Sequence, residues 1–145
     1  MSRAPTKFII HCSYTPPSMN IGAKEIREWH TSPDPNDPSK PWRDIGYHWV
    51  INRNGGIEKG RNESVMGAHT RGQNAHSIGV CLVGGMAEND RRPETNFTCA
   101  QYDALSKLIQ QIRGRYPNIE ISGHNDWDKG RACPTFNAKE FGACL

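Results

Sequence analysis

The chain has 145 residues, of which 35% are hydrophobic and 23% are charged, and its formal net charge is +3. These values indicate one globular α/β or α+β domain and exclude a disordered or fibrous chain. No run approaches the roughly 18 apolar residues of a membrane span, so we expect no stable membrane insertion. The first residues lack the apolar stretch of a secretion signal, and no dense Lys/Arg block indicates nucleic-acid binding.

The N-terminal part of the chain predicts a strand followed by a short helix. Three consecutive apolar residues in KFIIHC predict a buried strand over residues 7–12. Residues 20–30 show helical spacing, with Asn20 as the expected N-cap and with Ile26 and Trp29 on the expected apolar side. We therefore expect a central strand and a helix that covers it.

A proline-rich loop and a hairpin follow. Residues 32–42 hold four prolines, which exclude a helix or a central strand in this segment. Residues 45–52 are aromatic and β-branched and predict a strand. The Arg-Asn-Gly-Gly sequence at 53–56 is typical of a hairpin turn, and it leads into an expected partner strand over residues 56–61.

A long polar loop precedes the most apolar strand of the chain. Residues 64–77 are rich in glycine and contain two histidines, and residues 77–85 read as a fully buried strand. Thr98 and Gln101 have the spacing of a capping box at the start of a helix. Apolar residues then recur at helical spacing: Tyr102, Leu105, Leu108, Ile109 and Ile112.

The C-terminal part completes the predicted sheet. Gly114 and Pro117 indicate the end of the long helix, and residues 118–122 predict a last central strand. A short helix is expected over residues 137–143. The predicted fold class is therefore α/β, with a central mixed β-sheet flanked by two or three helices.

Two histidines stand where predicted strands end, and a cysteine follows on a nearby loop. His11 ends the first strand, His124 follows the last one, and Cys133 lies nine residues beyond His124. If the two strands are adjacent, both imidazoles reach one rim of the sheet. Three such ligands leave one tetrahedral position open, which is typical of catalytic zinc. The residues alone also fit a hydrogen-bonded polar loop with one buried cysteine.

Other side chains are candidates for the same site. Tyr47 and His48 are neighbours on a predicted strand, so only one of them can face the site. His69 lies in a loop too polar to be core, which suits contact with a substrate. His30 and His76 are expected at the surface.

The chain resembles the superfamily of type 2 N-acetylmuramoyl-L-alanine amidases and peptidoglycan recognition proteins, and within it a phage endolysin. The motifs that carry the resemblance are EIREWH, DIGYHWVI, GAHTRGQNAHSIGVCLVGG, NFTCAQ and GHNDW…ACPTF, in this order. The resemblance implies a zinc cleft at one rim of the sheet, with one ion per chain held by His11, His124 and Cys133. It also implies the substrate, the amide between the lactyl group of N-acetylmuramic acid and L-alanine in peptidoglycan.

The resemblance further implies roles for individual residues. Tyr47 matches a catalytic tyrosine, and His69 and Asn74 match positions that line the substrate groove. A catalytic lysine of the family corresponds in position to Arg131, which would act through its charge because arginine does not release its proton at working pH. Lys129 is the alternative for this role.

The resemblance also sets expectations for the whole protein. We expect residues 1–145 to form one catalytic amidase domain without a separate wall-binding module, monomeric and kept in the host cytoplasm until the membrane is opened. A non-catalytic peptidoglycan-binding module is the alternative, although such relatives typically lose the cysteine ligand. Two segments depart from the phage relative, a longer loop at 31–44 and a shorter N-terminal arm. The shorter arm puts a possible partner, a phage RNA polymerase, in doubt.

Overall fold

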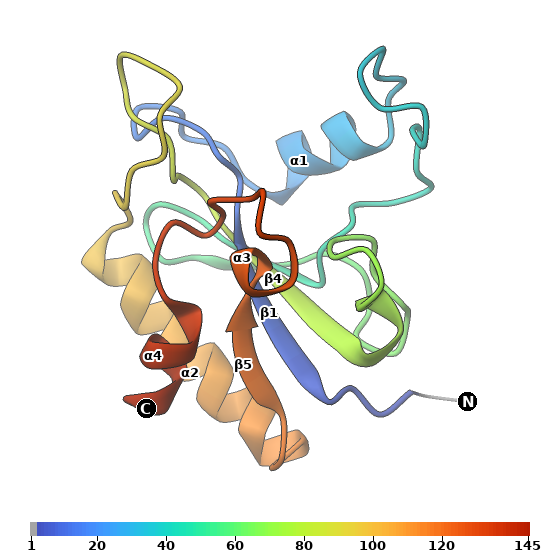
Figure 1. Cartoon of the computed structure of the whole chain (residues 1–145), viewed down its shortest axis with the longest axis vertical. Coiled ribbons are helices and arrows are strands. Elements are labelled where there is room, and N and C mark those ends of the chain that lie inside the picture. Colours follow the sequence, from blue (N-terminus) through green and yellow to red (C-terminus); the bar gives the residue numbers. More distant parts are fainter. Residues whose placement is uncertain (1–2) are drawn as a thin grey trace.

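The computed structural model describes residues 3–145, which form a five-stranded mixed β-sheet with helices against it (Figure 1). The strand order is β3-β2-β4-β1-β5. All neighbouring strands are parallel except β2 and β3, which form the predicted antiparallel hairpin. The strands are β1 (Lys7–Cys12), β2 (Trp49–Ile51), β3 (Ile57–Lys59), β4 (Ser77–Leu82) and β5 (Glu120–Gly123). The predicted fold class is confirmed.

Four α-helices and one 3₁₀ turn accompany the sheet in the described part of the chain. They are α1 (Ala23–His30), α2 (Cys99–Arg115), α3 (His124–Trp127), α4 (Ala138–Ala143) and the 3₁₀ turn Asn74–His76. The sequence predicts only two or three helices, because α3 and the 3₁₀ turn are too short to show a periodic pattern. Within residues 3–145, no helix combines the length and the apolar character needed to cross a membrane.

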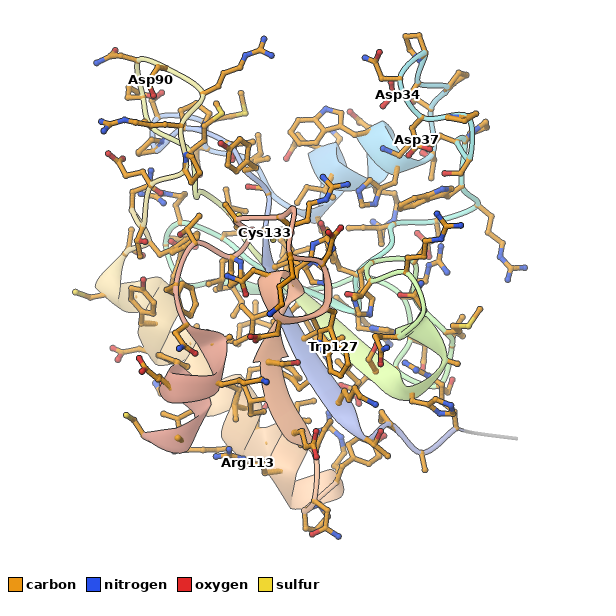
Figure 2. All side chains as sticks on the ribbon, viewed as in Figure 1. Asp34, Asp37, Asp90, Arg113, Trp127 and Cys133 are labelled. Carbon is orange, nitrogen blue, oxygen red and sulfur yellow. The ribbon has the colours of Figure 1, made fainter. Side chains whose placement is uncertain are left out.

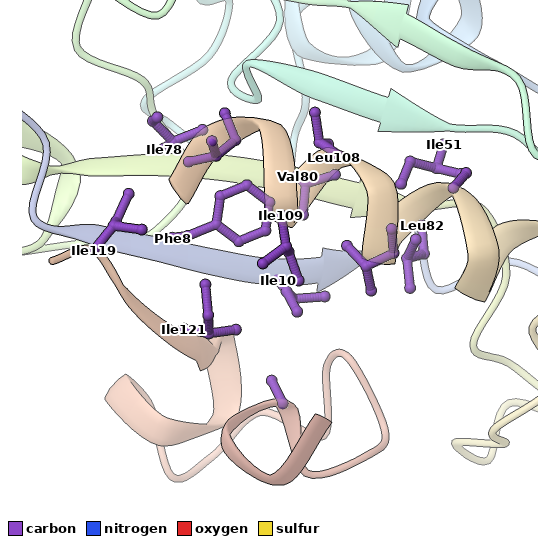
Figure 3. Close-up of a cluster of buried hydrophobic side chains, with 14 residues drawn as sticks. Phe8, Ile10, Ile51, Ile78, Val80, Leu82, Leu108, Ile109, Ile119 and Ile121 are labelled. Carbon is purple, nitrogen blue, oxygen red and sulfur yellow. The ribbon is translucent and has the colours of Figure 1, made fainter. Parts of the chain in front are cut away.

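The main core lies between the sheet and α2. Phe8 and Ile10 of β1 point toward α2, where Leu105 and Ile109 are fully buried against them (Figure 3). Because successive side chains of a strand point to opposite faces, His11 lies on the face of the sheet away from α2. The alternation in β1 therefore separates the packing face from the face that carries the histidine.

The capping box of α2 is confirmed and also ties the helix to the sheet. The Gln101 backbone N–H donates to Thr98 Oγ1 at 3.1 Å, and the Thr98 N–H donates to Gln101 Oε1 at 2.9 Å. The Gln101 side-chain nitrogen also donates to the carbonyls of Ile51 and Val83. One buried amide thus caps α2 and satisfies backbone groups of two neighbouring chain segments.

Helix α1 covers the opposite face, with details that differ from the prediction. Ile26 is buried as expected, but Trp29 is 44% exposed. The prediction that Trp29 lies on the apolar side of the helix was therefore wrong. The N-cap is Gly22 and not Asn20. Glu25 accepts the Gly22 N–H at 2.7 Å, and this local bond starts the helix three residues later than the pattern suggests.

Two strands also differ from their predicted form. β2 covers only Trp49–Ile51 and not residues 45–52, because the Gly46 carbonyl accepts the Ala68 N–H at 2.9 Å and so pairs with the 64–77 loop. β5 lies at the edge of the sheet and not in its centre, since within residues 3–145 it pairs with β1 alone. Its adjacency to β1, on which the candidate site depends, is confirmed.

We expect the fold to lose stability in mild acid because of His48. This side chain is fully buried, its Nδ1 accepts the Gly79 N–H at 3.0 Å, and burial lowers its pKa from 6.5 to about 4. The unfolded chain therefore binds a proton more readily, and the stability present above pH 6.5 is lost as the pH falls toward 4. The loss is at most about 3 kcal/mol for this group.

Urea unfolding at pH 7.5 and pH 4.5 measures this loss, and His48→Gln is the matched variant. The variant has no titrating group at this position, so its free energy of unfolding should change less between the two pH values. Equal changes in the variant and the natural protein would assign the acid sensitivity to other groups.

Candidate metal centre

His11 and His124 meet because they follow paired residues of two parallel strands. Ile10 of β1 is opposite Gly123 of β5 in the register of the sheet. The next residue of each chain segment is a histidine, and both strands end at the same rim. The two imidazole centroids lie 4.6 Å apart, as expected from the sequence if the strands were adjacent.

Cys133 reaches the same rim on the loop after α3 (Figure 2). The Asn125 N–H donates to the Cys133 carbonyl at 2.8 Å, and the Cys12 N–H donates to Cys133 Sγ at 3.0 Å. Gly123 permits this return of the chain, since a Cβ there would lie only 2.8 Å from Pro134 Cδ. The strand end that supplies His11 thus also positions the sulfur.

One potential ligand atom from each of His11, His124 and Cys133 lies within 4.8 Å of the other two. Burial, followed by the neighbouring His69 and His124, lowers the pKa of His11 well below its usual value, so the imidazole is neutral and can donate a lone pair. Contact with Cys12, followed by burial, raises the pKa of the Cys133 thiol, and a bound cation would favour its thiolate. Two imidazoles and one sulfur fit zinc with an open position.

Tyr47, and not His48, faces this group. The Tyr47 ring lies 5.1 Å from the His11 ring between centroids. Burial raises the pKa of Tyr47 well above 10, so the phenol keeps its proton and can donate a hydrogen bond. His48 is buried outside the cleft lining, with its ring 5.8 Å from that of His69 between centroids, and its Nδ1 accepts the Gly79 N–H. The sequence did not decide which of Tyr47 and His48 faces the site, and in the structure it is Tyr47.

His69 and Asn74 lie beside the candidate ligands, with contacts that the sequence did not indicate. His69 Nδ1 is 2.9 Å from His11 Nε2. The Asn74 side-chain oxygen accepts the N–H groups of His69 and Thr70, both at 2.9 Å. Both residues line the cleft, as does Thr70, which sequence reasoning missed although it directly follows His69.

The group opens into a cleft of about 700 Å³. The 31–44 loop forms part of its wall through Asp37 and Trp42. His30 also lines the cleft, packs against Trp42 with the ring centroids 4.8 Å apart and the planes tilted by 58°, and accepts the Gly46 N–H at 2.9 Å. The expectation that His30 is a surface residue was therefore wrong. In the sequence, the sign of this cleft wall was Trp42, an aromatic residue at the end of the proline-rich loop.

The two candidates for the lysine role lie in different places. Arg131 lines the cleft and forms an exposed ion pair with Asp128, with 3.4 Å between Nε and Oδ2. Lys129 is exposed and lines a neighbouring hollow of about 500 Å³ that Arg131 borders as well. Arg131 is therefore the one of the two that faces the candidate metal centre.

The fold and the site together define a domain of the peptidoglycan amidase and recognition-protein class. The chain belongs to the N-acetylmuramoyl-L-alanine amidase family, whose model matches residues 1–136. The predicted family resemblance is thereby confirmed.

Relatives of known sequence include phage endolysins. The endolysin of Enterobacteria phage T3 is 41% identical over 140 residues, which are 96% of this chain and 87% of that protein. The endolysin of Escherichia phage T7 is 39% identical over 132 residues, which are 91% of this chain and 82% of that protein. The expected resemblance to a phage endolysin is confirmed as well.

Solved structures share the fold. N-acetylmuramoyl-L-alanine amidase LysC from Clostridium intestinale superposes with a TM-score of 0.76 and 28% identity, covering 97% of this chain and 85% of its own. Drosophila PGRP-LB superposes with a TM-score of 0.70 and 25% identity, covering 98% and 80%. The predicted mixed sheet with flanking helices is thus the fold of this class.

Proposed function

We propose that this chain is a zinc-dependent N-acetylmuramoyl-L-alanine amidase and a phage endolysin. It hydrolyses the amide between the lactyl group of N-acetylmuramic acid and the L-alanine of the peptidoglycan stem. The observation that carries the proposal is the set of His11, His124 and Cys133, whose ligand atoms lie within 4.8 Å of one another and whose two histidines line an open cleft. This one domain acts as the whole catalytic unit, held in the host cytoplasm until the membrane opens.

The metal and Tyr47 have different roles in the proposed reaction. His11, His124 and Cys133 would hold zinc, and zinc bound there would supply Lewis-acid chemistry that activates water and polarises a carbonyl. The protonated Tyr47 hydroxyl donates a hydrogen bond to the carbonyl oxygen as negative charge develops on it. Such a donor, fixed in a partly buried site, stabilises the transition state more than the ground state.

Arg131 supplies positive charge at the mouth of the cleft. Its guanidinium attracts and stabilises the developing oxyanion without transferring a proton, since arginine stays charged at working pH. Asp128, 3.4 Å away, restrains the side chain near the cleft. The acid–base work of the reaction therefore lies with groups other than Arg131.

Digestion of purified muropeptides tests the function. The protein, loaded with one equivalent of zinc, should release new L-alanine amino termini without new reducing sugar ends, and a chelator should stop the reaction. New reducing ends would identify a glycosidase, and binding of muropeptides without cleavage would identify a recognition module. Either result would overturn the proposed function.

Removal of the Arg131 charge is expected to lower kcat/KM about 100-fold. This is the lower end of the loss for one oxyanion-stabilising group, and we expect the lower end because the Arg131 side chain is exposed. Arg131→Lys should recover most of this loss, since it keeps the charge, whereas Arg131→Ala should not. Steady-state kinetics on a soluble muropeptide measures both.

Lys129→Ala is the matched control for this prediction. Lys129 lines the adjacent hollow, so its removal should leave kcat/KM within about twofold, the range of a charge outside the site. If Lys129→Ala loses activity and Arg131→Ala does not, the role belongs to Lys129.

A further inference from the structure

We propose that His69, supported by Ser77, is a positioning residue that fixes which nitrogen of His11 faces the metal. This inference rests on the proposed zinc site, and it gives His69 a role other than contact with the substrate. The side chain lines the cleft, but its Nδ1 lies 2.9 Å from Nε2 of the candidate ligand His11. A group that contacts a metal-binding histidine in this way orients the imidazole of that histidine.

A chain of close polar contacts leads from the sheet to His11. Ser77 Oγ, at the start of β4, lies 3.2 Å from His69 Nε2. His69 Nδ1 lies 2.9 Å from His11 Nε2, and the two rings meet edge to face at 88°. Thr70 Oγ1 lies 3.1 Å from the same His11 nitrogen. Thr70 Oγ1 also lies 2.9 Å from His69 Nδ1, so this hydroxyl contacts the facing nitrogens of both rings.

These contacts indicate which nitrogen of the His11 and His69 rings carries the proton. With His11 Nε2 engaged by His69 and Thr70, Nδ1 is the His11 nitrogen left to coordinate a metal. A neutral imidazole that coordinates through Nδ1 carries its proton on Nε2. That N–H donates to His69 Nδ1, which places the His69 proton on Nε2, from where it is donated to Ser77. Thr70 Oγ1 lies within hydrogen-bond distance of both facing nitrogens, so it shares this contact, and His11 Nδ1 is the nitrogen left for the metal.

The fold makes room for this arrangement at β4. A Cβ at Gly79 would lie 2.6 Å from the His69 ring, so the ring packs directly on the strand backbone. Ser77, Thr70 and His11 are each at most 2% exposed. Burial keeps water from replacing the hydrogen bond between the rings, so the bond keeps the orientation of His11 fixed.

Zinc affinity measured by competition with a chromophoric chelator tests the proposal without use of the catalytic reaction. His69→Leu removes the nearer acceptor for His11 Nε2, leaving Thr70 Oγ1 at 3.1 Å, and should weaken zinc binding about 10-fold to 100-fold. His69→Asn keeps an oxygen near the position of Nδ1 and should recover much of the affinity. The unfolding curves of the two metal-free variants should agree, which separates positioning of the ligand from general stability.

A spectroscopic measurement on the natural protein decides the same point. In zinc-loaded protein labelled with ¹⁵N at histidine, His11 should show its proton on Nε2 and the metal on Nδ1. The opposite tautomer, or unchanged zinc affinity in folded His69→Leu, would overturn the proposal. Failure of the natural protein to bind zinc would instead overturn the proposed function on which this inference rests.

Discussion

Replacing Cys133 with alanine is expected to remove both zinc binding and amidase activity. Cys133 is the sulfur donor of the candidate site, and its ligand atom lies within 4.8 Å of those of His11 and His124. Two imidazoles alone hold zinc weakly, so the affinity should fall by more than about 100-fold, the upper end of the loss for an outer-sphere partner. Metal analysis after gel filtration and muropeptide digestion measure the two effects.

Cys99→Ala is the matched control for the loss of a thiol. Cys99 is exposed at the first turn of α2 and takes no part in the cleft. This variant should keep one zinc per chain and full activity. If the Cys133→Ala protein still binds zinc and still cleaves muropeptides, Cys133 is not a zinc ligand.

Tyr47→Phe is expected to lower kcat by about 100-fold to 1,000-fold, as for the loss of one donor to a developing oxyanion. The substitution keeps the aromatic ring that packs 5.1 Å from the ring of His11, so the fold and the metal site should persist. KM should change little, because the hydroxyl interacts mainly with the transition state. Zinc content should remain at one per chain.

Tyr102→Phe serves as the control for the loss of a phenol hydroxyl. Tyr102 packs in an aromatic cluster with Phe97 and Phe136, away from the cleft-lining residues. Its kcat should equal that of the natural protein. A Tyr47→Phe enzyme with kcat within about twofold of the natural value would exclude the hydroxyl from the transition state, since one lost donor costs far more than this.

The sheet was predictable where the sequence pattern was strong. β1 and β4 follow from continuous apolar runs, because central parallel strands are buried on both faces. The start of α2 follows from the local hydrogen bonds of Thr98 and Gln101. These elements depend on interactions between near neighbours in sequence, which a single sequence displays directly.

The misjudged elements depend on contacts between distant segments. The edge position of β5 depends on strand order, which apolar content does not reveal. The shortening of β2 depends on a bond between Gly46 and Ala68, 22 residues apart along the chain. Trp29 has helical spacing, but the packing of the other segments leaves its side chain 44% exposed.

The same division applies to the candidate site. The meeting of His11 and His124 was predictable, because side chains at the ends of adjacent parallel strands share one rim. The contact between His11 and His69 was not, since it joins residues 58 apart along the chain through the packing of a loop on β4. The place of His30 in the cleft wall was missed for a similar reason, because the bond to Gly46 turns its ring inward.

The edge position of β5 has a consequence for handling the protein. His124 follows this strand directly, and His11 is the next-to-last residue of β1, the strand that β5 pairs with in the described part of the chain. A metal bound by both histidines ties the edge strand to the sheet, so chelation loosens that tie. An edge strand that is less firmly held can pair with another chain, and metal-free samples are therefore expected to aggregate sooner on storage than zinc-loaded ones.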